Sequence, residues 1–145
     1  MMTARTLRVD AELAELAGVR QFIRDVAADA GAPVECLEDL VQAVDEAATN
    51  VITHGYEGAP GWIDVSATAE GDDLVIRVED DAPPFDPTTR PEPDLTIPPL
   101  ERRPGGMGVH LIRAATDSMT YRPRPGGGNI LTLVRSMRPR QKEAG

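Results

Sequence analysis

Residues 46–57 read EAATNVITHGYE, and this stretch decides the fold. It is the end of a predicted helix, because apolar residues recur at helical spacing upstream and a glycine follows. On a helix, Glu46 and Asn50 lie four positions apart and project from the same face, one turn apart. A glutamate that can take a proton beside an asparagine oxygen that can hold a hard cation suits phosphoryl transfer.

The helix that ends in this stretch is predicted over residues 34–53. Its apolar residues fall within an arc about 120° wide, which should face a sheet. They are Leu37, Leu40, Val41, Val44, Ala48, Val51 and Ile52. The opposite arc carries Asp39, Gln42, Ala43, Glu46, Asn50 and Thr53. Periodicity alone therefore leaves open that Glu46 and Asn50 are ordinary solvent-facing residues.

The rest of the chain predicts an α+β fold, a two-layer sandwich with a mixed, mostly antiparallel sheet and helices on one face. Alternation of apolar and polar residues, helical spacing and turn residues define the elements. Strands are expected at 6–10, 62–68, 72–79, 117–122 and 129–135, and further helices at 11–30 and 108–115. Residues 83–104 contain eight prolines in 22 positions, which excludes a long helix and favours a functional lid.

A chain of 145 residues suffices for one domain with a buried core, so residues 1–145 are expected to form a single domain. Cys36 is the only cysteine, and no intramolecular disulfide can form. No stretch approaches the roughly 18 apolar residues of a membrane span. The N-terminus is also too charged for a secretory signal. These features predict a cytoplasmic protein without membrane contact.

The net charge of −9 is unevenly distributed. Residues 10–101 hold 22 acidic and 4 basic residues, whereas residues 102–145 hold 9 basic and 2 acidic ones. The acidic part argues against direct nucleic-acid binding, which depends on neutralising phosphates. The basic part is either a partner surface or the phosphate side of a nucleotide site. For the basic tail, about 136–145, a merely solvating role is an equal alternative.

Two further segments complete a pattern with residues 46–57. Residues 78–86 read VEDDAPPFD, a strand end that enters a rigid turn, and residues 104–112 read PGGMGVHLI, a glycine run that opens a helix. In order and spacing, the three blocks resemble the GHKL ATPase superfamily, and within it the anti-sigma-factor serine kinases of the RsbW and SpoIIAB type. The resemblance covers about residues 6–134. It implies a Bergerat-type fold, which has the layers predicted above.

The resemblance implies that Glu46 acts as the general base or positions that base. It also implies that Asn50 is a ligand of a Mg²⁺ ion, and that this ion bridges the phosphates. Asp80 matches the aspartate that accepts a hydrogen bond from the adenine amino group, and its neighbour Asp81 is expected to be a bystander. The usual Asp-x-Gly-x-Gly pattern is broken by Ala82, which also belongs to the base-contacting block, and by Pro84. These two changes leave nucleotide affinity open.

The glycine block is expected to contact phosphates through Gly105, Gly106, Met107 and Gly108, at the start of a helix. The lid would span about residues 82–107, with Phe85 as a packing anchor at its start. Arg103, with Arg102 beside it, is a candidate for sensing the γ-phosphate. Thr132 is expected near Asp80, and a plain strand threonine is the alternative. For His54, a structural role at the helix end is favoured over catalysis.

The resemblance thus implies a Mg²⁺-dependent serine/threonine protein kinase and anti-sigma factor that uses ATP and works by partner switching. Its expected partners are a sigma factor or analogous regulator, a STAS-domain antagonist that becomes phosphorylated, and a second copy in a homodimer. ATP and ADP would favour different complexes. The principal alternative is a non-catalytic nucleotide-binding module of the same fold that sequesters a partner. An ATPase or a sensor-kinase catalytic fragment is a further alternative.

Overall fold

The computed structural model describes residues 4–89, 96–98 and 107–138. Helices and strands follow one another in the predicted order, and their boundaries differ from the predicted ones by at most five residues. The elements are β1 (Arg5–Asp10), the 3₁₀ helix η1 (Leu13–Glu15), α1 (Leu16–Asp29), α2 (Val34–Asn50), the π-helix η2 (Val51–Gly55), β2 (Trp62–Glu70), β3 (Asp73–Asp80), the 3₁₀ helix η3 (Pro87–Thr89), α3 (Met107–Ala115), β4 (Ser118–Pro123) and β5 (Asn129–Ser136).

The five strands form one sheet in the order β1-β2-β3-β5-β4. Every neighbouring pair is antiparallel, so the prediction of a mixed sheet is wrong for the described residues. The reason is the position of β5. A connection through α3 brings β4 back in the same direction as β3, but β5 lies between these two strands and runs opposite to both. The α+β class and the two layers are confirmed.

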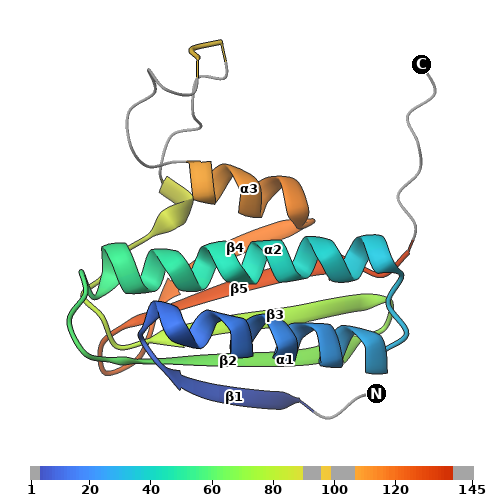
Figure 1. Cartoon of the computed structure of the whole chain (residues 1–145), viewed down its shortest axis with the longest axis horizontal. Coiled ribbons are helices and arrows are strands. Elements are labelled where there is room, and N and C mark those ends of the chain that lie inside the picture. The colour runs from blue at the N-terminus through green and yellow to red at the C-terminus, as the bar shows by residue number, and fades with distance from the viewer. Residues whose placement is uncertain (1–3, 90–95, 99–106, 139–145) are drawn as a thin grey trace.

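Helices α1, α2 and α3 lie side by side on one face of the sheet, with α2 in the middle (Figure 1). The apolar side chains of α1 and α2 pack against the strand residues that face them, such as Ile63 and Ile76, and both of these are almost completely buried. Burial of this kind is the main force that stabilises the fold. No helix in the described ranges is long and apolar enough to cross a membrane.

The position of α2 between two helices changes one expectation about its polar arc. Ala43 lies on that arc, yet it is fully buried, and Glu46 and Asn50 are half-buried. The cause is α3, which packs against α2 and covers part of the arc that periodicity assigns to solvent. Glu46 and Asn50 are therefore not ordinary solvent-facing residues, and they lie beside a second helix.

The end of α2 is a π-helical turn instead of a plain α-helical stop. In η2 the Tyr56 N–H donates to the Val51 carbonyl, five residues back, at 2.8 Å. A π-turn accommodates one extra residue in the helix, and such turns occur often at functional sites. After this turn the chain leaves the helix layer through Gly58, which has a positive φ of 80° that favours glycine.

Candidate nucleotide site

The first part of the site lies where α2 meets the start of α3. A Cβ added to Gly108 would lie 3.0 Å from Glu46 Oε2 and 3.5 Å from Asn50 Oδ1. The glycine therefore lets the backbone of α3 approach both side chains closely, which a larger residue would prevent. Two of the three sequence blocks meet here, as their order in the chain suggested.

Among the described residues, Glu46 has no charged partner that would stabilise its carboxylate. No hydrogen bond or ion pair between described side chains involves it. Burial raises its pKa above the usual glutamate value, and the neighbouring Asp45 carboxylate raises it further. A carboxylate with a raised pKa holds a proton more tightly and is a stronger base. Its environment thus fits proton abstraction.

Asn50, one turn further along α2, also makes no side-chain hydrogen bond within the described part of the chain. Its carboxamide lines a pocket beside the helix. Mg²⁺ prefers oxygen ligands and keeps several waters, so a single amide oxygen beside phosphate oxygens fits its chemistry. The described residues contain no cluster of three or more His, Cys, Asp or Glu side chains arranged for a metal. An ion here would depend on phosphates for the rest of its ligands.

The second part of the site is Asp80 at the end of β3, which is 2% exposed. Its Oδ1 accepts hydrogen bonds from Asn129 Nδ2 at 2.8 Å and from the Ala82 N–H at 2.9 Å. Burial raises the pKa of this carboxyl, while the two hydrogen bonds lower it in part. Both of these hydrogen bonds go to Oδ1, and Asp80 also lines the pocket. The carboxylate can therefore accept a further donor at Oδ2.

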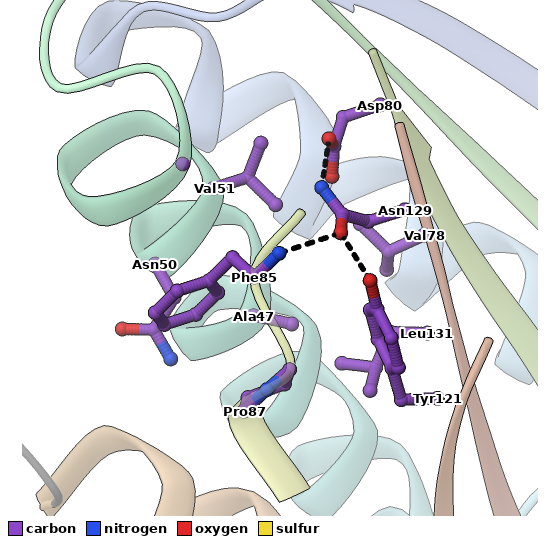
Figure 2. A pocket seen from close by; sticks show the side chains of 11 residues that line it. Ala47, Asn50, Val51, Val78, Asp80, Phe85, Pro87, Tyr121, Asn129 and Leu131 are labelled. Carbon is purple, nitrogen blue, oxygen red and sulfur yellow. Dashed lines mark hydrogen bonds between the residues drawn. The ribbon is translucent and has the colours of Figure 1, made fainter. Parts of the chain in front are cut away.

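Asn129 is the functional residue that the sequence interpretation missed. It lies opposite Asp80 in the β3–β5 ladder and faces the helix layer. Its Oδ1 accepts hydrogen bonds from Tyr121 Oη at 2.6 Å and from the Phe85 N–H at 2.9 Å (Figure 2). The signal in the sequence was its place directly after three glycines, at the start of a strand.

Thr132, which was expected near Asp80, is not there. It pairs with Arg77 in β3 and with Thr120 in β4. Side chains alternate along a strand, and three positions separate Thr132 from Asn129, so the two point to opposite faces of the sheet. The threonine therefore lies on the face without helices. The expectation was wrong by three residues in register.

The pocket between these groups is small. Its volume is about 20 Å³, enough for about one water molecule. Phe85 and Pro87 line it on the side away from the sheet (Figure 2). Small-molecule pockets typically enclose about 300–1,000 Å³. For a base to enter, residues 85–87, called the closing segment below, would have to move outward.

A glycine at the end of the helix accommodates the departure at Ala82, and another glycine allows two strand ends to approach each other closely. A Cβ on Gly55 would lie 3.2 Å from the Ala82 methyl, so the bare Gly55 leaves room for that methyl. Gly128 has a φ of +113°, and a Cβ there would lie 2.0 Å from the Asp80 carbonyl oxygen. This close approach brings the start of β5 against the end of β3.

The end of the helix serves a structural purpose. Tyr56 Oη accepts hydrogen bonds from the N–H groups of Trp62 and Asp81, and its own proton has two acceptors, the Trp62 carbonyl and Asp81 Oδ1. Burial raises the pKa of Tyr56 to about 12. Asp81, expected to be a bystander, thus anchors this tyrosine. His54 is exposed and stacks on Phe85, with ring centroids 6.0 Å apart.

Several expected contacts fall outside the described residues: Arg102, Arg103, Gly105 and Gly106, most of the lid over 82–107, and the tail beyond Arg138. Helix α3 begins at Met107, as expected for the glycine block. At the start of the tail, Arg138 Nε donates to Asp72 Oδ2 at 2.7 Å.

Comparison with known proteins agrees with this geometry. The family model described as the histidine kinase-like ATPase domain matches residues 9–135. The anti-sigma F factor of Thermoanaerobacter sp. (strain X514) is 28% identical over 116 residues, which cover 80% of this chain and 81% of that protein. The serine-protein kinase RsbW of Listeria monocytogenes serotype 4a (strain HCC23) is 34% identical over 135 residues, covering 88% of this chain and 84% of that protein.

Among solved structures, the crystal structure of the RsbU and RsbW domains of a Mycobacterium tuberculosis protein is similar in fold. Its TM-score is 0.66 at 22% sequence identity. The match covers 93% of this chain and 32% of that longer chain, so the present chain spans about a third of it.

Proposed function

We propose that this chain, which belongs to the histidine kinase-like ATPase domain family, uses ATP to phosphorylate a serine or threonine of a partner protein. Within that family it belongs to the group of anti-sigma factors and RsbW-type serine-protein kinases. The observation that carries this proposal is the close approach of Gly108 to Glu46 and Asn50. This contact brings together the side chains that we propose as base and cation ligand and the N-terminal end of α3.

The nucleotide would be held by groups of two kinds. Asp80 would accept a hydrogen bond from the exocyclic amino group of adenine, a donor that guanine lacks at the corresponding position. The backbone N–H groups at the start of α3 would face the phosphates, since the first four of a helix have no partner within it. Asn50 would hold Mg²⁺, which neutralises charge on the phosphates and positions them.

Glu46 would accept the proton of the attacking hydroxyl. A bond then forms between the hydroxyl oxygen and the γ-phosphorus, the bond from the γ-phosphorus to the bridging oxygen breaks, and ADP leaves. Glu46 forms no ion pair within the described part of the chain, which supports this role, because a paired carboxylate would be a weaker base. If water replaced the hydroxyl, the same steps would give ATP hydrolysis.

The names of the relatives support a regulatory setting. One is an anti-sigma factor and another a serine-protein kinase. We therefore propose partner switching, in which the chain binds a sigma factor or analogous regulator and phosphorylates a STAS-domain antagonist, as a homodimer. The bound nucleotide would shift the balance only through its different affinity for the two complexes.

The test is phosphotransfer from labelled ATP, with Mg²⁺, to a STAS protein encoded beside this chain. The expected result is labelled phosphoserine or phosphothreonine with wild type and loss of at least about 100-fold with Glu46→Ala. Unchanged transfer in Glu46→Ala would overturn the role of Glu46. Binding of the STAS protein without transfer would overturn the kinase.

A second candidate is a non-catalytic module that sequesters its partner. The closed pocket of about 20 Å³, with Ala82 and Pro84 in place of the usual glycines, favours it. Calorimetry separates the two candidates. A protein that binds its partner but takes up no ATP would be this module.

A further inference from the structure

Asn129 connects two parts of the site that the proposed function treats separately. Its Nδ2 donates to Asp80 Oδ1 at 2.8 Å and to the Pro83 carbonyl at 3.2 Å, and its Oδ1 accepts from the Phe85 N–H. One carboxamide therefore contacts both the carboxylate that would read the base and the segment that closes the pocket. Tyr121 Oη, the remaining strong partner, fixes its position.

The chemistry of these partners determines the orientation of the amide. The Phe85 N–H can only donate, so the atom that it reaches must be the Asn129 oxygen. The NH₂ group then points at Asp80, which needs donors because its carboxylate is buried. The arrangement is fully satisfied: no buried side-chain polar atom in the described part of the chain lacks a partner.

Only one of these bonds conflicts with an occupied pocket. Phe85 and Pro87 line the closed pocket and must move for a base to enter. The Phe85 N–H bond to Asn129 Oδ1 then breaks, while the bond from Asn129 to Asp80 and the one from Tyr121 to Asn129 lie on the sheet and can persist (Figure 2). Asp80 would stay oriented through Nδ2 and would receive the base at Oδ2.

We propose that Asn129 is a positioning residue that couples base recognition at Asp80 to the closing segment: its carboxamide holds Phe85 over the empty pocket and releases it when a base binds. The base-linked half of this proposal rests on the proposed nucleotide binding. In this proposal the closing segment must open before a base binds, so the apparent affinity falls in proportion to the fraction of ligand-free molecules that is open.

The test is site-resolved amide hydrogen exchange at Phe85, first in the nucleotide-free protein. Loss of one hydrogen bond should speed exchange about five-fold in Asn129→Ala. The matched control is Thr132→Ala, on the same strand but the opposite face, which should leave the rate unchanged. Equal Phe85 rates in wild type and folded Asn129→Ala would overturn the proposal. If Asn129→Ala does not fold, Asn129→Ser, whose shorter side chain does not reach the Phe85 N–H, replaces it under the same criterion.

The second arm adds Mg²⁺-ATP to the wild-type protein. Exchange at Phe85 should rise, while the Ala82 N–H, which bonds to Asp80, stays protected. Saturation with ATP that leaves Phe85 protected would overturn the coupling. Absence of ATP uptake in calorimetry would instead overturn the proposed function and the base-linked half with it, and the nucleotide-free comparison would still decide whether Asn129 holds the segment.

Discussion

Asn129 and Asp80 face each other across the β3–β5 ladder, and Asn129 Nδ2 donates to Asp80 Oδ1 at 2.8 Å. Asp80 ends β3 and Asn129 begins β5, and the two residues lie 49 positions apart in the chain. The bond compensates part of the cost of burying a carboxylate and leaves its other oxygen available. The orientation of the carboxylate is thus set before any ligand arrives.

The role of Asp80 predicts that Asp80→Asn weakens ATP binding by at least about ten-fold, the effect of losing one hydrogen bond to a charged group. The variant keeps an oxygen for Ala82 and Asn129 but places an NH₂ group where the base donates. Titration calorimetry measures the change. The control is Asp81→Asn, since Asp81 is exposed and binds Tyr56 instead. Equal losses in the two variants would contradict the assignment.

The environment of Glu46 predicts opposite effects of Glu46→Gln on activity and stability. Phosphotransfer should fall by about 100-fold or more. In wild type it should decrease as the pH falls through the raised pKa of Glu46, because the base becomes protonated. Rates measured between pH 4.5 and 8 test this. If the remaining activity of the Glu46→Gln variant still fell at low pH as it does in wild type, that fall would belong to another group.

For stability the sign follows from the same raised pKa. The folded state binds the Glu46 proton more tightly than the unfolded state, so the free energy of unfolding falls as the pH rises from about 4.3 through the raised value. Glu46→Gln should therefore melt at a higher temperature than wild type at pH 7. The difference in melting temperature between Glu46→Gln and wild type should disappear at lower pH, where Glu46 is protonated in both the folded and the unfolded state. A lower melting temperature at pH 7 would count against this account.

Gly108→Ala is predicted to stabilise α3 and impair function. Alanine in a helix is favoured over glycine by about 1 kcal/mol, but the added methyl would lie 3.0 Å from Glu46 Oε2. Gly18→Ala in α1 is the matched control, because its methyl would meet nothing within 4 Å. Gly108→Ala should raise the melting temperature and lower the phosphotransfer rate, whereas Gly18→Ala should raise only the melting temperature. Full activity in Gly108→Ala would remove this glycine from the site.

Arg135 and Asp39 connect β5 to α2, and Arg135 is only 1% exposed. The guanidinium donates to Asp39 Oδ2 at 2.9 and 3.2 Å. Asp39→Ala leaves a buried cation without its partner and should lower the free energy of unfolding by about 3 kcal/mol. The double variant Asp39→Leu with Arg135→Met should recover most of this loss. Chemical denaturation measures both, and a double variant less stable than the single one would refute the explanation.

The sequence predicted the elements and the three blocks because these depend on local patterns. Helical spacing located α2 and placed Glu46 and Asn50 one turn apart on it, and the glycine run located the start of α3. The family assignment is confirmed by the comparisons. These successes share one cause: spacing along one helix, or a glycine at its start, needs no knowledge of neighbouring strands.

What the sequence could not predict depends on the order of the strands. Thr132 was expected beside Asp80, but the register of β5 puts Asn129 there, and a shift of this kind is decided by pairing between distant segments. Burial of Ala43 depends on α3 packing against α2. The closed pocket depends on Phe85 reaching Asn129, across 44 positions of sequence.

The π-turn at the end of α2 makes this region sensitive to length as well as to composition. One residue inserted into a regular α-helix turns every later residue by about 100° around the helix axis, and a π-turn absorbs such an insertion. Residues 51–55 absorb one extra residue in this way, so Tyr56 faces Trp62 and Asp81, whose N–H groups it accepts. A further residue inserted into α2 would not be absorbed and should turn Tyr56 away from both groups.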